Sequence, residues 1–138
     1  MQFKPKTDEE LNPLLQPGVY DYEVVKATDE ISQSQNEQIK LTLRTWDNQG
    51  KEIIVFDYLL EAMHYKIKHF CYGCGLSNLY ETGKLTAQDC IGRVGKFVIK
   101  IDKDKSGQYK DKNAVKDYIA ESDLSSKPSD LDDDIPGF

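Results

Sequence analysis

The chain has 138 residues, enough for one folded domain with a single hydrophobic core and too few for two. Hydrophobic residues make up 38% of it and charged residues 30%, as in a globular protein, and no apolar run is long enough to span a bilayer. Residues 1–10 lack the apolar stretch of a signal peptide, so we expect the protein in the cytoplasm, with its three cysteines as reduced thiols.

The net charge of −6 argues against an anionic partner until its distribution is considered. Residues 121–138 carry six acidic residues and one lysine, a net of −5, whereas residues 1–120 have a net of only −1. Within that nearly neutral body, residues 96–116 hold seven lysines against three aspartates, a local net of +4. The asymmetry predicts a body with a basic segment and a separate acidic tail.

The first predicted strand follows the Pro17-Gly18 turn. It covers residues 19–27, VYDYEVVKA, in which apolar and acidic residues alternate. The polar stretch that follows, residues 28–37, is predicted as a loop.

The second and third strands are predicted to form a hairpin. Residues 38–46, QIKLTLRTW, show the clearest alternation, with isoleucine and leucines on one face and Lys40, Arg44 and Trp46 on the other. The following DNQG predicts a type I turn with a left-handed glycine, which leads into a third strand over residues 52–59, EIIVFDYL.

The hydrophobic period then changes from two to between three and four. Residues 60–75 are predicted as one amphipathic helix because apolar residues recur at helical spacing. These are Leu60, Met63, Ile67, Phe70, Cys71 and Cys74. His64, His69, Cys71 and Cys74 also form a possible zinc-ligand pattern, but the two cysteines lie on the apolar face, so buried thiols are the preferred interpretation.

The residue pattern after the helix predicts a connector, two strands and a tail. The connector spans residues 77–95, with a helical turn starting at Thr86, and the fourth strand covers residues 96–102. A hydrophilic loop leads to a shorter fifth strand around residues 114–119, and the charged residues 121–138 are predicted to be disordered.

Three strands, a helix and two further strands follow the chain order of the OB-fold. We therefore expect an all-β protein, with a five-stranded OB-fold barrel, one helix between strands 3 and 4, and a disordered acidic tail. The expected domain comprises residues 1–120 and the tail residues 121–138. In this fold the face of strands 2 and 3, with the loops joining strands 1–2 and 4–5, takes up oligonucleotides.

Candidate nucleic-acid contacts follow from that face. Lys40 and Arg44 on strand 2 can meet phosphates, and Trp46 is either a stacking platform or a lid over the barrel edge. Strand 3 turns outward either Ile53 and Val55 or the set containing Phe56 and Tyr58, and the sequence leaves this register open. If the aromatic set faces out, its rings can stack with bases; otherwise they belong to the core.

The loop between strands 4 and 5 interleaves cations with an aromatic residue. Lys103, Lys105, Lys110 and Lys112 surround Tyr109, a composition that suits either nucleic-acid contact or a solvated hairpin tip.

The final residues, DDDIPGF, resemble the C-terminal tip of the bacterial single-stranded DNA-binding proteins, an acidic run followed by Asp-Ile-Pro-Phe. Gly137 departs from that pattern, because the family places phenylalanine directly after proline. The body is similar by pattern, in the GVYDYEVVKA strand, the SQNEQIKLTLRTWDNQG hairpin and the glycine-led GRVGKFVIKI segment. The whole chain thus resembles a bacteriophage or prophage member of this family.

The resemblance implies a sequence-independent single-stranded DNA-binding protein of phage DNA replication, recombination and repair in the bacterial host cytoplasm. Its tail would recruit replication and recombination proteins, since an apolar ring beside a carboxylate can enter a hydrophobic pocket next to a basic residue. The expected partner-binding residues are Asp132, Asp133, Asp134, Ile135, Pro136 and Phe138. The same acids are expected to compete with DNA for the cationic surface.

The sequence predicts neither an enzyme nor a cofactor, because no catalytic constellation or phosphate-binding loop appears. The alternative function is an OB-type protein-interaction adaptor whose aromatic residues are core and whose tail is its only working part. No membrane partner is expected, and the oligomeric state stays open, with a homo-oligomer among the options.

Overall fold

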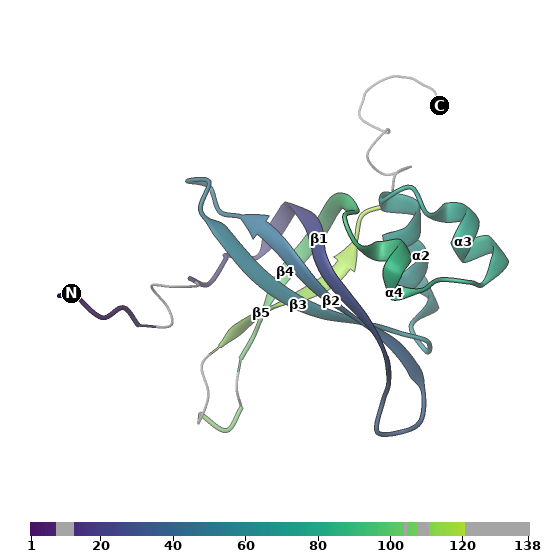
Figure 1. Cartoon of the computed structure of the whole chain (residues 1–138), viewed down its shortest axis with the longest axis horizontal. Helices are drawn as coiled ribbons and strands as arrows, with labels where there is room; N and C mark the ends of the chain where they lie inside the picture. The colour runs from purple at the N-terminus through teal and green to yellow at the C-terminus, as the bar shows by residue number, and fades with distance from the viewer. Residues whose placement is uncertain (8–12, 104, 108–110, 121–138) are drawn as a thin grey trace, which may run out of the picture.

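The computed structural model describes residues 1–7, 13–103, 105–107 and 111–120. Within these residues five strands form one antiparallel sheet in the order β3-β2-β1-β4-β5 (Figure 1). The strands are β1 (Gly18–Ile31), β2 (Glu37–Trp46), β3 (Glu52–Leu60), β4 (Val94–Asp102) and β5 (Lys112–Tyr118). The connection from β3 to β4 contains α2 (His64–Gly73), α3 (Ser77–Thr82) and α4 (Ala87–Cys90).

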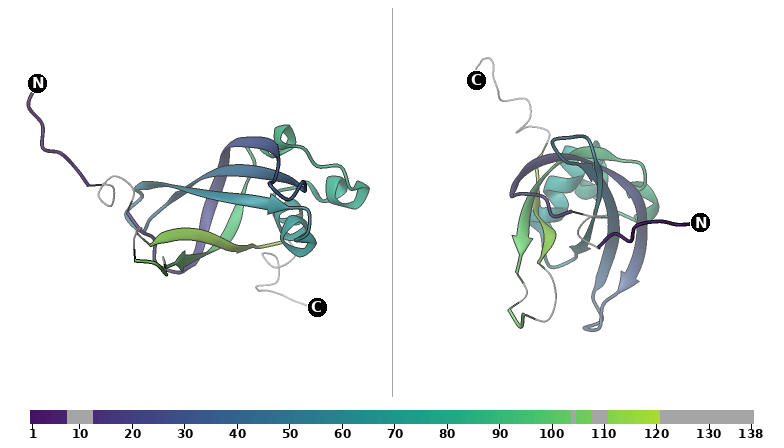
Figure 2. Two further views of the ribbon diagram at one scale, coloured as in Figure 1. Left: turned by 90° about the horizontal axis from the view of Figure 1, so that it is seen from below. Right: turned by 90° about the vertical axis from the view of Figure 1, so that its left-hand side faces the viewer.

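The long central strand β1 joins the two halves of the sheet. Its first part, from Gly18 to Glu23, pairs with β4, and its second part, from Tyr22 to Ile31, pairs with β2. The register against β2 shifts between Val24 and Lys26, and such a bulge bends a strand and increases its twist. The sheet is accordingly strongly curved around the core (Figure 2).

The sheet does not close into the predicted barrel. Its hydrogen-bonded ladder ends at β3 on one side and at β5 on the other. Side chains bridge the two edges instead: the Tyr118 hydroxyl donates to Asp57 Oδ2 at 2.7 Å, and Lys66 Nζ donates to Asp57 Oδ1 at 2.9 Å and to the Val115 carbonyl at 3.0 Å. Because a side chain from α2 occupies this seam, β3 and β5 are joined without backbone pairing.

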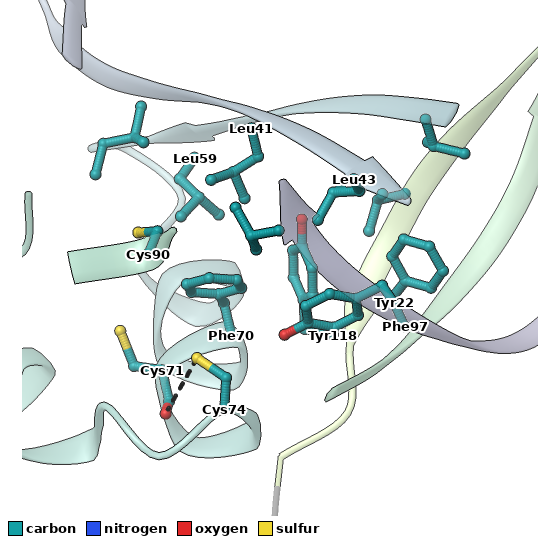
Figure 3. Packing of buried hydrophobic residues seen from close by; sticks show 14 of the residues in the cluster. Tyr22, Leu41, Leu43, Leu59, Phe70, Cys71, Cys74, Cys90, Phe97 and Tyr118 are labelled. Carbon is teal, nitrogen blue, oxygen red and sulfur yellow. Dashed lines mark hydrogen bonds between the residues drawn. The ribbon is translucent and has the colours of Figure 1, made fainter. Parts of the chain in front are cut away.

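The core is built around aromatic rings from four elements. The Tyr22 ring of β1 has its centroid 5.1 Å from that of Phe97 on β4 and 5.6 Å from that of Tyr118 on β5 (Figure 3). Phe70 of α2 packs edge-on against Tyr118 at 5.0 Å. Gly95 makes room for this cluster, since a Cβ there would lie 2.8 Å from the Tyr22 hydroxyl oxygen.

The predicted strands are all present, with changed ends. β2 and β3 match the expected hairpin to within a residue, and Gly50 has the left-handed φ of 82° that the predicted turn requires. β1 runs to Ile31 rather than ending at residue 27. The loop predicted over residues 28–37 is therefore reduced to residues 32–36. The polar end of β1 adopts the strand conformation because it pairs with β2. Thr28 lies opposite Lys40, and Ile31 lies opposite Glu37.

The prediction of a single helix is wrong. Leu60 belongs to β3, where it pairs with Gln38, and α2 begins only at His64. Helix α3 was not predicted, and α4 follows Thr86 as expected, with a capping box between Thr86 and Asp89.

Candidate nucleic-acid interface

The register of the β2–β3 hairpin decides which strand 3 residues face outward. Lys40 pairs with Tyr58 and Thr42 with Phe56, while Ile53 is buried. Phe56 is 55% exposed and Tyr58 is 42% exposed. Both rings therefore lie on the surface, and the interpretation that places them in the core is wrong.

We call this surface the outer face, and define it by the outward side chains of β1, β2 and β3. These include Lys26, Thr28, Lys40, Thr42, Arg44, Trp46, Ile54, Phe56 and Tyr58, together with the acidic residues Glu23, Glu30 and Glu52. A hollow of about 260 Å³ lies on it, lined by Lys26, Thr28 and Glu30 on β1, by Lys40 and Thr42 on β2, and by Phe56 on β3. Lys40 Nζ lies 5.4 Å from the centroid of the Phe56 ring. A cation and an exposed ring thus share one concave surface.

Trp46 lies at the end of β2 and is 38% exposed. Its cross-strand partner is Glu52, and Thr42, which faces Phe56, is four residues back along β2. At about 3.4 Å per residue, this spacing puts Trp46 roughly 14 Å along the strand from the position opposite Phe56. Trp46, Phe56 and Tyr58 therefore form a stripe along the outer face.

Arg44 is held by carboxylates. Its guanidinium donates to Glu23 at 2.9 Å and to Glu52 at 3.3 Å. Hydrogen bonds to Glu23 and then to Glu52 raise the pKa of Arg44. Two anions already neutralise this cation, so it contributes less attraction for a phosphate than Lys40 does.

Two lysines of the basic segment, residues 96–116, form ion pairs with aspartates. Lys96 binds Asp21 on β1 at 2.6 Å, and Lys100 binds Asp102 at 3.3 Å. The candidate lysines at residues 103, 105 and 112 are exposed around the β4–β5 connection. In both Figure 1 and Figure 2, the described part of this connection projects to the same side as the β1–β2 turn. Tyr109 and Lys110 lie outside the described residues.

The predicted partner-binding residues belong to the C-terminal tail. Asp132, Asp133, Asp134, Ile135, Pro136 and Phe138 all lie outside the described residues.

The histidine and cysteine pattern does not assemble a metal site. Cys71, Cys74 and Cys90 are buried free thiols, and His69 Nδ1 lies 3.0 Å from Asp117. In the part of the chain that the structure describes, no three His, Cys, Asp or Glu residues are grouped to hold a metal ion. The three sulfurs form part of the core instead.

Sequence reasoning missed the contribution of β1 to the outer face. Val25 and Lys26 are consecutive, yet both are exposed, because the bulge interrupts the alternation of this strand. Alternation counted from Tyr22 puts Lys26 on the buried side. The two adjacent valines of the VVK segment interrupt the alternation of apolar and polar residues. Such an interruption indicates a bulge, and a bulge here turns Lys26 outward.

Comparison with known proteins adds no relative: no family model matches the chain, and a search of curated proteins found none that matches. None of the helices among the described residues is long and apolar enough to cross a membrane.

Proposed function

We propose that this protein binds single-stranded DNA without sequence preference along its outer face, as a coating protein of phage DNA replication, recombination and repair. The observation that carries the proposal is the exposure of Phe56 and Tyr58 beside Lys40 on one concave sheet surface. Stacking on an aromatic ring contributes about 1–3 kcal/mol per base whatever the base, because every base has a π face.

The proposed fold is an OB-type domain opened along one seam. In this fold the strands corresponding to β3 and β5 are neighbours, and here the Asp57–Tyr118 hydrogen bond and Lys66 join them. The order β3-β2-β1-β4-β5, with helices only between β3 and β4, supports this assignment.

The proposed mechanism is binding, with no catalytic step and no cofactor. Bases stack on Phe56 and Tyr58, with Trp46 as a further platform at the end of the stripe. Lys40 and Lys26 meet phosphates, and the exposed lysines of the β4–β5 connection extend the cationic path. The acidic tail, with its similarity to the bacterial single-stranded DNA-binding proteins, recruits replication and recombination proteins in the host cytoplasm.

The test compares aromatic residues on and off the outer face. We expect Phe56→Ala and Tyr58→Ala each to weaken binding to oligo(dT) by about 5- to 150-fold, the equivalent of about 1–3 kcal/mol. Tyr65→Ala is the matched control, because Tyr65 is 54% exposed but lies on α2. Fluorescence anisotropy of labelled oligo(dT) measures the affinities, with duplex DNA as the competitor. Equal losses in all three variants, or no loss in the first two, would contradict the proposal.

A second comparison separates the two strand 2 cations. We expect Lys40→Gln to lower the salt dependence of binding, with the log-log slope changing by about 0.7, the value for one single-strand phosphate contact. Arg44→Gln should change the slope less, because Glu23 and Glu52 already neutralise Arg44. A larger effect at Arg44 would mean that DNA displaces both carboxylates.

A protein-interaction adaptor is the second candidate, in a form that uses the exposed rings of Phe56 and Tyr58 rather than the core rings that the sequence-based alternative assumed. The neutralised Arg44 favours it, since exposed rings with balanced charges also suit a protein partner. Trp46 fluorescence that does not respond to oligo(dT), together with unchanged anisotropy, would select the adaptor.

A further inference from the structure

A second cavity, with no assigned role, lies beyond the end of the outer-face hollow, and Glu30 lines both. It measures about 810 Å³ and lies between the far ends of β1 and β2 and the helices α2 and α3. Its apolar lining includes Ile39, Ile67, Leu79 and Leu85. At its edge Ile31 is 61% exposed, although it is a large apolar side chain. We call this cavity the acidic pocket, because carboxylates surround its apolar lining.

Carboxylates surround the apolar lining. They are Asp29, Glu30, Glu37, Glu61 and Glu81. Three of them accept hydrogen bonds: Asp29 from the Ala87 N–H, Glu30 from Gln38 and Glu81 from Tyr72. No lysine or arginine is among the residues that line the pocket in the described part of the chain. A ligand that fits must therefore carry apolar surface together with positive charge.

Residues 1–7 of the chain have that chemistry. The segment reads MQFKPKT, with two lysines, and the acidic residues Asp8, Glu9 and Glu10 follow it in the sequence. Phe3 is 76% exposed, so a large aromatic side chain contacts little of its own domain. Pro5 restricts the backbone beside it, which lowers the entropy that such a segment loses on docking. We call this segment the arm.

The arm and the acidic pocket belong to opposite sides of the molecule. Figures 1 and 2 show residues 1–7 leading away from the body on the side opposite α3, whereas α3 lines the pocket. We propose that the acidic pocket binds the arm of a second copy of this chain, with Phe3 in the apolar lining and Lys4 and Lys6 against the carboxylates.

This contact is head-to-tail, because different surfaces of each copy meet. Such heterologous contacts add copies in a row unless the rotation closes a ring. If the proposed function holds, the row places neighbouring copies along one strand of DNA, and the arm makes the coating cooperative. The association itself requires no DNA, so it can be tested separately.

The first experiment measures the mass of the full chain by sedimentation over a range of concentrations at low salt, without DNA. We expect concentration-dependent assembly, weakened at least about tenfold by Phe3→Ala, since buried aromatic anchors dominate interfaces. Lys4→Glu with Lys6→Glu should abolish it, as should Glu37→Lys with Glu61→Lys in the pocket. Lys116→Glu is the charge control, because Lys116 is exposed on β5 away from the pocket.

Mixing the two charge-reversed proteins provides the sharper result. We expect partial recovery of assembly in the mixture, because each reversed arm then faces a reversed pocket in the other protein. A chain that stays monomeric at all concentrations overturns the proposal, and so does assembly that the pocket variants leave unchanged.

A second measurement locates the arm. A peptide of residues 1–7, added to a chain that lacks them, should shift the NMR signals of Leu79 and Leu85 and leave those of Phe56 unchanged. No shift at millimolar peptide overturns the proposal. A full chain that is monomeric yet shows the same shifts places the arm in its own pocket and also overturns it. A full chain that assembles in this way but does not bind oligo(dT) would contradict the proposed function and leave the arm contact intact.

Discussion

A single buried cation connects the two open edges of the sheet. Lys66 is 6% exposed, and its ammonium group contacts Asp57 and the Val115 carbonyl. Burial raises the pKa of Asp57, while the charge of Lys66 and hydrogen bonds from Tyr118 and Lys66 act in the opposite direction. A buried pair is costly to break, since removing one partner leaves the other charge without compensation.

Lys66→Met is therefore expected to lower the free energy of unfolding by about 3–5 kcal/mol. Urea unfolding followed by circular dichroism measures it. Lys68→Met is the control, because Lys68 is exposed on the same helix and should change stability by less than about 0.5 kcal/mol. Equal stability of the two variants would exclude a structural role for the pair.

The buried thiols predict a loss of stability at high pH. Burial raises the pKa of Cys71 and Cys90 to about 12 and that of Cys74 to about 11, from the ordinary 9.0. Because the folded state binds these protons more tightly than the unfolded state, their contribution is complete below pH 9 and is lost as pH rises toward 11 to 12.

The free energy of unfolding, measured between pH 8 and pH 11, should accordingly fall above about pH 9. At pH 8 the three thiols should react with a disulfide reagent only as fast as the protein opens. Rapid labelling of the native protein would show that the thiols are accessible.

At the scale of elements, the hairpin is the part best predicted from sequence. Strand β2 alternates strictly, and its turn contains a glycine with positive φ, so local chemistry is sufficient. The start of α2 was not predictable in this way. Leu60 has the helical spacing of the residues that follow it, yet it pairs with Gln38 in the sheet. The ladder with a distant strand overrides the local period.

The end of α2 packs closely against the chain that leaves β5. A Cβ at Gly73 would lie 2.3 Å from the Ile119 carbonyl oxygen, which is a backbone atom. Gly73→Ala is thus expected to destabilise the protein by about 1–3 kcal/mol through overpacking. Alanine at an ordinary helical site would instead stabilise it by about 1 kcal/mol.

Thermal unfolding of this variant beside Asn78→Ala measures the difference, because Asn78 is an exposed site on α3. A stabilised Gly73→Ala protein would mean that α2 and the β5 exit lie further apart than the structure places them.

For the whole molecule, charge is divided between the body and the tail. Residues 121–138 hold a net of −5, while residues 96–116 hold +4, of which Lys96 and Lys100 are paired with aspartates. The tail and DNA would compete for the remaining exposed lysines of this segment. Competition between the two is electrostatic, so it must weaken as salt screens it.

Deleting residues 121–138 is therefore expected to raise single-stranded DNA affinity at low salt by an amount on the order of tenfold, about 1.4 kcal/mol. A full-length variant with the six tail acids changed to amides is the matched control for length and should behave in the same way. Oligo(dT) titrations at two salt concentrations measure both. An unchanged low-salt affinity would exclude tail competition.

The sequence by itself determined the succession of the five strands along the chain, the β2–β3 hairpin, the helical turn that follows Thr86 and the separation of charge between body and tail. These features depend on spacing, turn chemistry and composition over a few neighbouring residues. Only the tertiary structure decided that Phe56 and Tyr58 face solvent, that Arg44 is neutralised and that Lys66 is buried. Each of these depends on pairing between residues far apart in the chain, as Lys66 and Val115 are. Local periodicity carries no information about such partners.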